Sequence, residues 1–194
     1  IQEEIIAYHG SPHRFDKFSV DKIGTGEGAQ VFGRGLYFAE SAEVARKYRD
    51  DLALPSTPEN DVAKSYLRDA GGDVEEAVLR VEAYAKDTQQ DLSAVVKKLR
   101  EDSGSLYEVA IRANKDELLD WDLPLSEQSP KVQAALSDMK PEWTGAQIYE
   151  SSRLVPGDFM DKQAATDALR KRGVVGIRYL DGFSRDKAEG TRNL

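Results

Sequence analysis

Two short segments near the start of the chain carry residue types suited to binding a nucleotide. The first is an apolar stretch that ends in His9, Gly10 and Ser11, and the second places Tyr37 behind two glycines, with Tyr48 eleven residues further on. A histidine can bind a hydroxyl group, a tyrosine offers a flat face, and a glycine lets backbone approach a ligand closely. Together the two segments predict a nucleotide site.

A glycine-rich stretch, residues 24–35, lies between these segments. Glycine stands at every second position from 24 to 28, which favours a flexible loop over regular structure. Backbone amides in such a loop can meet a pyrophosphate without a large basic surface. Because no helix follows directly, the spacing is not a Rossmann fingerprint, and a mobile connection remains the alternative.

The charge balance requires any phosphate site to be local. The chain has 27 Lys and Arg residues against 35 Asp and Glu residues, a net charge of −8, so no overall basic field draws it to nucleic acid or anionic lipid. It has no cysteine, which excludes disulfides, thiolate metal sites and a cysteine nucleophile. The two histidines, His9 and His13, are too few for most zinc sites, and we expect no metal.

The length and hydropathy pattern predict a single domain without a membrane segment. A chain of 194 residues can bury a substantial core. No apolar run approaches the roughly 20 residues that span a bilayer, and the start lacks the basic and apolar regions of a signal peptide. We expect one domain over residues 1–194, taken from a longer protein, with a helical insertion at about residues 55–104.

The periodicity of apolar residues predicts an α+β fold with two small, mostly antiparallel sheets. Strands are expected at residues 5–8, 36–39, 106–111 and 174–180, and at the end of the chain. After Ser41, a plausible N-cap, apolar residues recur on one face of a helix, which points Tyr48 inward. Further helices are expected at residues 130–139, 145–151 and 162–171, the last of them closed by Gly173.

The predicted insertion contains helices at residues 61–70, from Asp73 onward, and at residues 92–99. Asp73 and Glu76 form a capping-box pattern at the start of the second helix. These helices are amphipathic and carry no catalytic constellation, so they are interpreted as packing or recognition elements.

The ordered set of motifs resembles the ADP-ribosyltransferases of the diphtheria-toxin and poly(ADP-ribose) polymerase type. The resemblance rests on His-Gly, then Gly-x-Gly-Leu-Tyr-Phe-Ala with a second tyrosine, then Leu-Tyr-Glu-Val. Four stretches are similar, more closely, to such domains in phage and mobile-element polyproteins: Tyr-His-Gly-Ser-Pro-His, Gly-Thr-Gly-Glu-Gly-Ala-Gln, Asp-Trp-Asp-x-Pro-Leu-Ser-Glu-Gln and Gly-Ile-Arg-Tyr-Leu-Asp-Gly. The similarity spans nearly the whole chain except the insertion, and the order is more specific than any one motif.

The resemblance implies a cleft formed by the two sheets that binds NAD+ as co-substrate. In it, Tyr37 and Tyr48 would sandwich the nicotinamide, the backbone of Gly10 would bind the carboxamide, and His9 would bind a ribose hydroxyl. Asn193 falls at the third motif position. Further contacts to the dinucleotide are implied for Ser11, Gly26, Gln30, Arg34 and Gly35.

Two positions depart from the family pattern. The polymerases have a glutamate where this chain has Asn193, and asparagine cannot act as a general base, which argues against chain-forming polymerase activity. The serine expected three residues before the second tyrosine is Ala45 here. A carboxylate from another segment could complete the site, and Glu127, Glu150 and Glu189 remain alternatives.

Each of these residues also has a structural interpretation. His9 could be a hydrogen-bonded residue at a strand end, and the two tyrosines could be core aromatics. Asp120-Trp121-Asp122 offers two carboxylates, which are more often turn and capping residues than metal ligands. The stretch Ser126-Glu127-Gln128 is a weaker candidate for the border of an acceptor site.

The resemblance implies mono-ADP-ribosyl transfer from NAD+ to a macromolecule by a phage or toxin effector in the cytoplasm of a bacterial host or target cell. Protein is favoured over nucleic acid as acceptor, because the chain is acidic. The alternatives are an NAD+ glycohydrolase, a catalytically silent module that binds NAD+ or ADP-ribose, and a purely structural phage domain.

Overall fold

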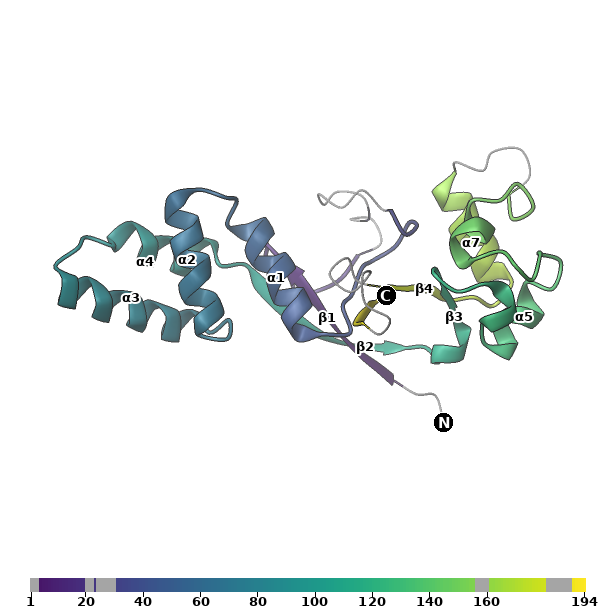
Figure 1. The fold of residues 1–194 in the computed structure, drawn as a ribbon, viewed down its shortest axis with the longest axis horizontal. Coiled ribbons are helices and arrows are strands. Elements are labelled where there is room, and N and C mark those ends of the chain that lie inside the picture. Colours follow the sequence, from purple (N-terminus) through teal and green to yellow (C-terminus); the bar gives the residue numbers. More distant parts are fainter. Residues whose placement is uncertain (1–3, 20–22, 24–30, 156–160, 181–189) are drawn as a thin grey trace. The chain divides into compact units, whose positions relative to one another are not determined.

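The computed structural model describes residues 4–19, 23, 31–155, 161–180 and 190–194, and in them the fold is α+β. Seven helices and two small sheets are present in these ranges (Figure 1). Among the described residues, no helix combines the length and the apolar character needed to span a lipid bilayer.

The chain forms two compact units. Unit 1 comprises residues 1–7, 17–41 and 109–194, and unit 2 comprises residues 8–16 and 42–108. Strands β1 (Glu4–Ser11) and β2 (Ser105–Arg112) pair in a two-stranded sheet, and the boundary between the units passes through both. These strands confirm the predictions for residues 5–8 and 106–111.

Unit 2 is mainly helical. It contains α1 (Ala42–Ala53), α2 (Pro58–Asp69), α3 (Val74–Thr88) and α4 (Ser93–Asp102), of which α2, α3 and α4 form one cluster (Figure 1). The buried apolar side chains of this cluster, which we call the helical core, are Leu54, Ala63, Leu67, Ala77, Val78, Val81, Val95 and Leu99. The three helices predicted for the insertion are therefore present.

Two caps define where α2 and α3 begin. The Asp73 carboxylate accepts a hydrogen bond from the Glu76 N–H, 3.0 Å away, which confirms the predicted N-cap of α3. The Thr57 hydroxyl accepts from the Asn60 N–H at 3.2 Å, and Pro58 occupies the first turn. Helix α2 thus starts before residue 61, because Pro58 stands at a position where its missing N–H has no helical partner to lose.

Unit 1 is built on a three-stranded sheet in the order β3 (Leu118–Asp120), β4 (Gly176–Leu180), β5 (Arg192–Asn193). Strands β3 and β4 run parallel and β4 and β5 antiparallel, so this sheet is mixed rather than antiparallel. The strand predicted at residues 36–39 is a single bridge between Ala39 and Asn193. Phe38 and Leu194 exchange both backbone hydrogen bonds beside it, at 2.8 and 2.7 Å.

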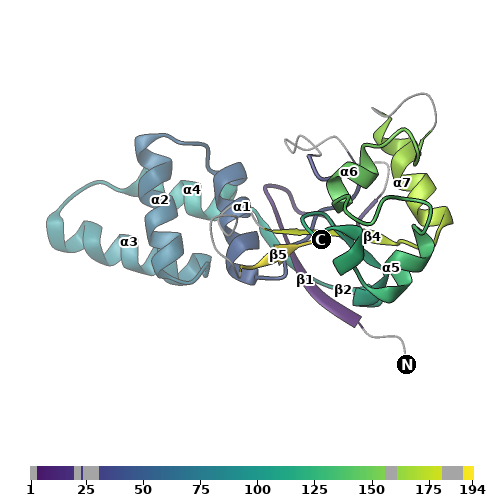
Figure 2. The same ribbon diagram turned by 45° about the vertical axis from the view of Figure 1, so that its right-hand side comes forward.

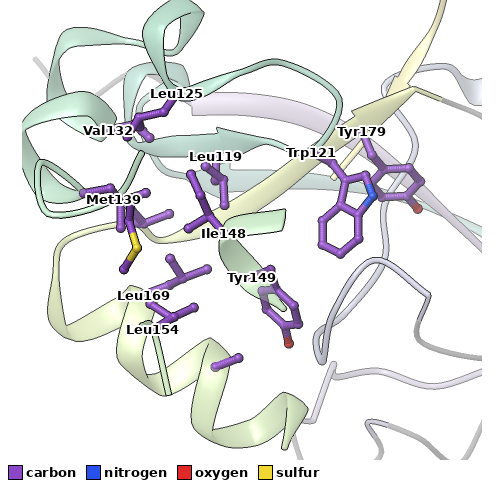
Figure 3. Close-up of a cluster of buried hydrophobic side chains, with 13 residues drawn as sticks. Leu119, Trp121, Leu125, Val132, Met139, Ile148, Tyr149, Leu154, Leu169 and Tyr179 are labelled. Carbon is purple, nitrogen blue, oxygen red and sulfur yellow. The ribbon is translucent and has the colours of Figure 1, made fainter. Parts of the chain in front are cut away.

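The register of this sheet sends its side chains to two different faces. Tyr179 lies opposite Asn193, and with Leu119 and Ile177 it belongs to the apolar face, which packs in the core of unit 1 (Figure 3). The other face carries charges that pair with one another: Arg178 with Glu40 at 3.0 Å, and Arg192 with Asp120 at 2.5 Å. The alternation in Ile177, Arg178 and Tyr179 is the sequence signal for this arrangement.

Helices α5 (Pro130–Ala135), α6 (Gly145–Tyr149) and α7 (Lys162–Lys171) connect β3 to β4 (Figure 2). Helix α6 begins close to β3, because a Cβ at Gly145 would lie 2.2 Å from the Asp120 carbonyl oxygen. Helix α7 ends before Gly173, which has a φ of +87°, as predicted for a C-terminal glycine. Both α5 and α6 are shorter than their apolar patterns predict.

The helical core predicts unequal effects for two leucines. Leu67 is fully buried in it, and Leu79 is 61% exposed on α3. We expect Leu67→Ala to lower the free energy of unfolding by about 2–5 kcal/mol, because it leaves a cavity. Leu79→Ala, the matched control, should change it by less than about 0.5 kcal/mol. Urea denaturation followed by circular dichroism measures both, and equal effects would contradict the helical core.

Candidate functional site

The residues predicted to bind NAD+ are distributed over both units. Unit 2 holds His9, Gly10, Ser11 and Tyr48, and unit 1 holds Arg34, Gly35, Tyr37 and Asn193. Gly26 and Gln30 lie outside the described residues.

His9, near the end of β1, lies in a group of three rings that we call the histidine cluster. Phe15 and Tyr107 stack on each other with their centroids 4.4 Å apart. The His9 ring is tilted against both, at 6.1 Å from Phe15 and 6.5 Å from Tyr107. The Phe15 N–H also donates to the Tyr107 hydroxyl at 2.7 Å. The loop after β1 is thereby tied to the start of β2.

An open hollow of about 370 Å³ lies beside the histidine cluster. Its lining residues are Arg14, Phe15, Asp16, Ser105, Leu106 and Tyr107. Aromatic side chains flanked by one cation and one anion suit a flat, polar ligand. The sequence pattern does not single out Tyr107 for this role, because Phe15 and Tyr107 are 92 residues apart in the chain and only the fold links them.

Gly10 is explained by packing between β1 and α1. A Cβ at Gly10 would lie 2.0 Å from the Ala45 carbonyl oxygen and 2.7 Å from the Arg49 backbone nitrogen. The next residue, Ser11, is buried, and its hydroxyl accepts from the His13 N–H at 3.1 Å. Glycine is therefore required here by the neighbouring helix, whatever ligand the strand end binds.

The prediction that Tyr48 points inward is wrong. Helix α1 buries Ala45 and Arg49, whereas Tyr48 is 46% exposed. The buried face is the one that meets the Gly10 backbone, and it passes through positions 45 and 49 rather than 48. Arg49 can occupy this face because its guanidinium lies 2.7 Å from the Asp50 carboxylate. Burial raises the pKa of Asp50 above its usual range.

Tyr37 packs in a chain of aromatic rings in unit 1. Its ring meets the edge of Tyr179, with centroids 6.1 Å apart, and Tyr179 stacks on Phe32 at 3.9 Å. The Tyr37 hydroxyl donates to the Gly33 carbonyl oxygen at 2.5 Å. Partial burial raises the pKa of Tyr37 from 10.0 to about 12, so the phenol is neutral at pH 7.

Asn193 lies next to the same aromatic chain. It is 3% exposed and pairs with Tyr179 on one side and Ala39 on the other. Residues directly opposite each other in antiparallel pairs project from the same face, so Asn193 shares a sheet face with Tyr179. Its Oδ1 is buried and has no hydrogen-bond partner within the described ranges. Tyr37 and Asn193 thus both adjoin Tyr179.

Arg34 and Gly35 differ in the atoms that surround them. The Arg34 N–H donates to the Tyr149 hydroxyl at 3.2 Å, and the Thr166 hydroxyl donates to the Arg34 carbonyl oxygen at 3.2 Å. The Arg34 side chain donates to Gln163. Among the described residues, a Cβ at Gly35 would meet no atom within 4 Å, so they leave open space beside this residue.

The carboxylates considered from the sequence have different environments. Asp120 accepts hydrogen bonds from Arg192 and from the Asp122 N–H, and Asp122 accepts from the Leu180 N–H, so both act as turn and sheet residues. Gln128 is buried and bonds both backbone groups of Asp120, at 2.8 and 2.7 Å. It is therefore a structural residue.

Glu127 and Glu150 are both exposed, and Glu189 lies outside the described residues. In the part of the chain that the structure describes, no group of three or more His, Asp or Glu side chains could hold a metal ion.

Comparison of the chain with protein-family models, with curated proteins and with solved structures found no match.

Gly10 and Gly35 give a matched pair of substitutions. We expect Gly10→Ala to lower the free energy of unfolding by about 3 kcal/mol, because its Cβ would collide with the Ala45 carbonyl oxygen. Gly35→Ala should be tolerated, because the added methyl group enters open space. Thermal denaturation of the two variants measures the difference, and a stable Gly10→Ala variant would refute the close approach of β1 to α1.

Tyr37 should be visible in a tyrosine titration. As the pH rises, Tyr37 should ionise near pH 12, which is followed by the ultraviolet absorbance of phenolate. Because folding raises the pKa of Tyr37, its neutral phenol contributes fully to the stability of the fold below about pH 10. This contribution is lost as the pH rises toward 12. Tyr37→Phe should remove the late step, whereas Tyr84→Phe, at a ring that is 47% exposed, should leave it in place.

Proposed function

We propose that the protein is an ADP-ribosyltransferase that transfers a single ADP-ribose from NAD+ to a macromolecule, with protein favoured as acceptor. The observation that carries the proposal is the position of Tyr37 and Asn193. They are far apart in the chain, yet both adjoin Tyr179 on one side of one sheet. The resemblance assigns both of these motif positions to one ligand, together with His9 and Tyr48, and the pairing of residues 38–40 with 192–194 supports that assignment.

In the proposed reaction, the bond between nicotinamide and ribose breaks while the ribose carries oxocarbenium-like charge. The nicotinamide leaves as a neutral molecule, so the protein mainly has to orient the bond and exclude water. Tyr37 would offer its neutral ring to the nicotinamide, and His9 would hold a ribose hydroxyl. The backbone of Gly10 would bind the carboxamide, and open space at Gly35 would let the backbone approach the dinucleotide.

A catalytically silent module that binds NAD+ or ADP-ribose is the second candidate. It is favoured by Asn193, whose amide can accept a hydrogen bond from a ribose hydroxyl but cannot take a proton from an acceptor. Ala45 points the same way, because it is buried against β1 and offers no hydroxyl for the carboxamide. An NAD+ glycohydrolase, with water as acceptor, is the remaining enzyme alternative.

Product analysis separates these functions. The purified protein is incubated with labelled NAD+ and a bacterial lysate, and both free nicotinamide and labelled macromolecules are measured. Release of nicotinamide with a labelled band supports the transferase, and release without a band supports the glycohydrolase. Binding without release supports the silent module. Neither binding nor release would refute all three.

The two histidines provide the test of the site. We expect His9→Ala to lower NAD+ turnover about 100-fold, because the ribose loses a group that orients it. His13→Ala is the matched control, since His13 is exposed and its backbone N–H and carbonyl oxygen make its contacts with Ser11 and Tyr107. Equal turnover in the two variants would contradict the role of His9.

A further inference from the structure

Two hydrogen bonds with side-chain hydroxyls hold the backbone of Arg34. The Arg34 N–H donates to the Tyr149 hydroxyl at 3.2 Å, and the Thr166 hydroxyl donates to the Arg34 carbonyl at 3.2 Å. The hydroxyls of Tyr149 and Thr166 lie 3.0 Å apart. Side chains from α6 and α7 therefore bind both backbone groups of Arg34, in the way that a neighbouring strand would. We call this arrangement the Arg34 clamp.

Tyr149 is the fixed member of the Arg34 clamp. It is 4% exposed, and its ring is tilted against Trp121 at a centroid distance of 5.6 Å, within the core of unit 1 (Figure 3). Its hydroxyl is also 2.8 Å from the Lys162 carbonyl oxygen, at the start of α7. The core holds the ring of Tyr149 and α7 holds its hydroxyl. The position of the Tyr149 oxygen is therefore determined by contacts that do not involve Arg34.

The Arg34 clamp continues into the residues on either side. Gly33 has a φ of +101°, and a Cβ there would lie 3.0 Å from Cζ of Tyr149, so only glycine fits against this ring. The carbonyl of Gly33 in turn accepts the hydrogen bond of the Tyr37 hydroxyl. The orientation of Tyr37 therefore depends on a backbone segment that Tyr149 holds in place.

We propose that Tyr149 is a positioning residue, which acts on NAD+ binding through residues 33–37 without touching the ligand. This inference rests on the proposed function, because it takes Tyr37 as the residue that meets the nicotinamide. When the Tyr149 hydroxyl is lost, the Arg34 N–H has no partner in the core and the segment opens more often. Tyr37 then spends less time in the orientation that binds the ring.

The test removes one hydroxyl at a time and measures two quantities. Tyr149→Phe keeps the ring in the core, and we expect the amide hydrogen of Arg34 to exchange about tenfold faster, as for the loss of one hydrogen bond. NAD+ affinity should fall by about the same factor. Thr166→Val should also speed the exchange and weaken NAD+ binding. Thr166→Ser keeps the hydroxyl, so both quantities should stay near their wild-type values.

Ser151→Ala is the matched control. Ser151 lies just after α6, and its hydroxyl donates to the Ile148 carbonyl oxygen at 2.8 Å, so the variant also loses a hydrogen bond in unit 1. Neither Arg34 exchange nor NAD+ affinity should change in it. If it weakens NAD+ binding as much as Tyr149→Phe does, the effect is one of general stability and the positioning role is wrong.

The outcomes separate this inference from the proposed function. Unchanged exchange at Arg34 in both Tyr149→Phe and Thr166→Val would refute the Arg34 clamp. Faster exchange with unchanged NAD+ affinity would refute the positioning role, while the proposed function would stand on the wild-type protein. A wild-type protein that does not bind NAD+ would refute the proposed function and with it the positioning role, and the exchange data would still decide whether the clamp exists.

Discussion

Antiparallel pairing of Tyr179 with Asn193 determines which side chains of unit 1 face its core. In this register Tyr179 joins the apolar cluster, while Arg178 and Arg192 lie on the other face and pair with Glu40 and Asp120. A shift by one residue would bring Arg192 into the core and separate it from Asp120, leaving a buried charge without its partner. Since Asn193 and the neighbouring Tyr37 both depend on this register, the core and the candidate site of unit 1 are specified together.

In unit 2 the equivalent constraint is the close packing of backbone around Arg49. Gly10 approaches α1 on one side, and a Cβ at Gly104 would lie 2.5 Å from the Ser11 carbonyl oxygen and 2.8 Å from Cγ of Arg49. Nη2 of Arg49 lies 2.7 Å from the Asp50 carboxylate without the geometry of a hydrogen bond, and within the described ranges it has no other partner. A buried guanidinium that lacks a hydrogen bond is stable only where a carboxylate compensates its charge. Asp50 is therefore required for the packing around Arg49.

The sequence predicted what depends on local signals and failed where distant residues decide. Capping at Asp73 and the glycine after α7 follow from residue types alone, and both are confirmed. The apolar spacing of the helix favours the buried face for Tyr48, whereas the fold buries Arg49 instead. The contact of β1 with α1 decides which face of the helix is buried, and no pattern within the helix sequence indicates this contact. The histidine cluster cannot be predicted from the sequence for the same reason, since Phe15 and Tyr107 meet only in the fold.

The segment that carries Tyr37 is held by side-chain hydroxyls rather than by strand pairing. Buried backbone groups need partners, and the carbonyl of Gly33 and both polar groups of Arg34 receive theirs from Tyr37, Tyr149 and Thr166. Gly33 can adopt a positive φ here because it has no Cβ, and the side-chain hydroxyls supply the hydrogen bonds that a neighbouring strand would otherwise supply. The described residues leave space open beside Gly35, one residue beyond the clamp. A backbone that is rigid at 34 and uncovered at 35 is suited to meet a ligand without rearrangement, because its ordering entropy is already lost in the folded protein.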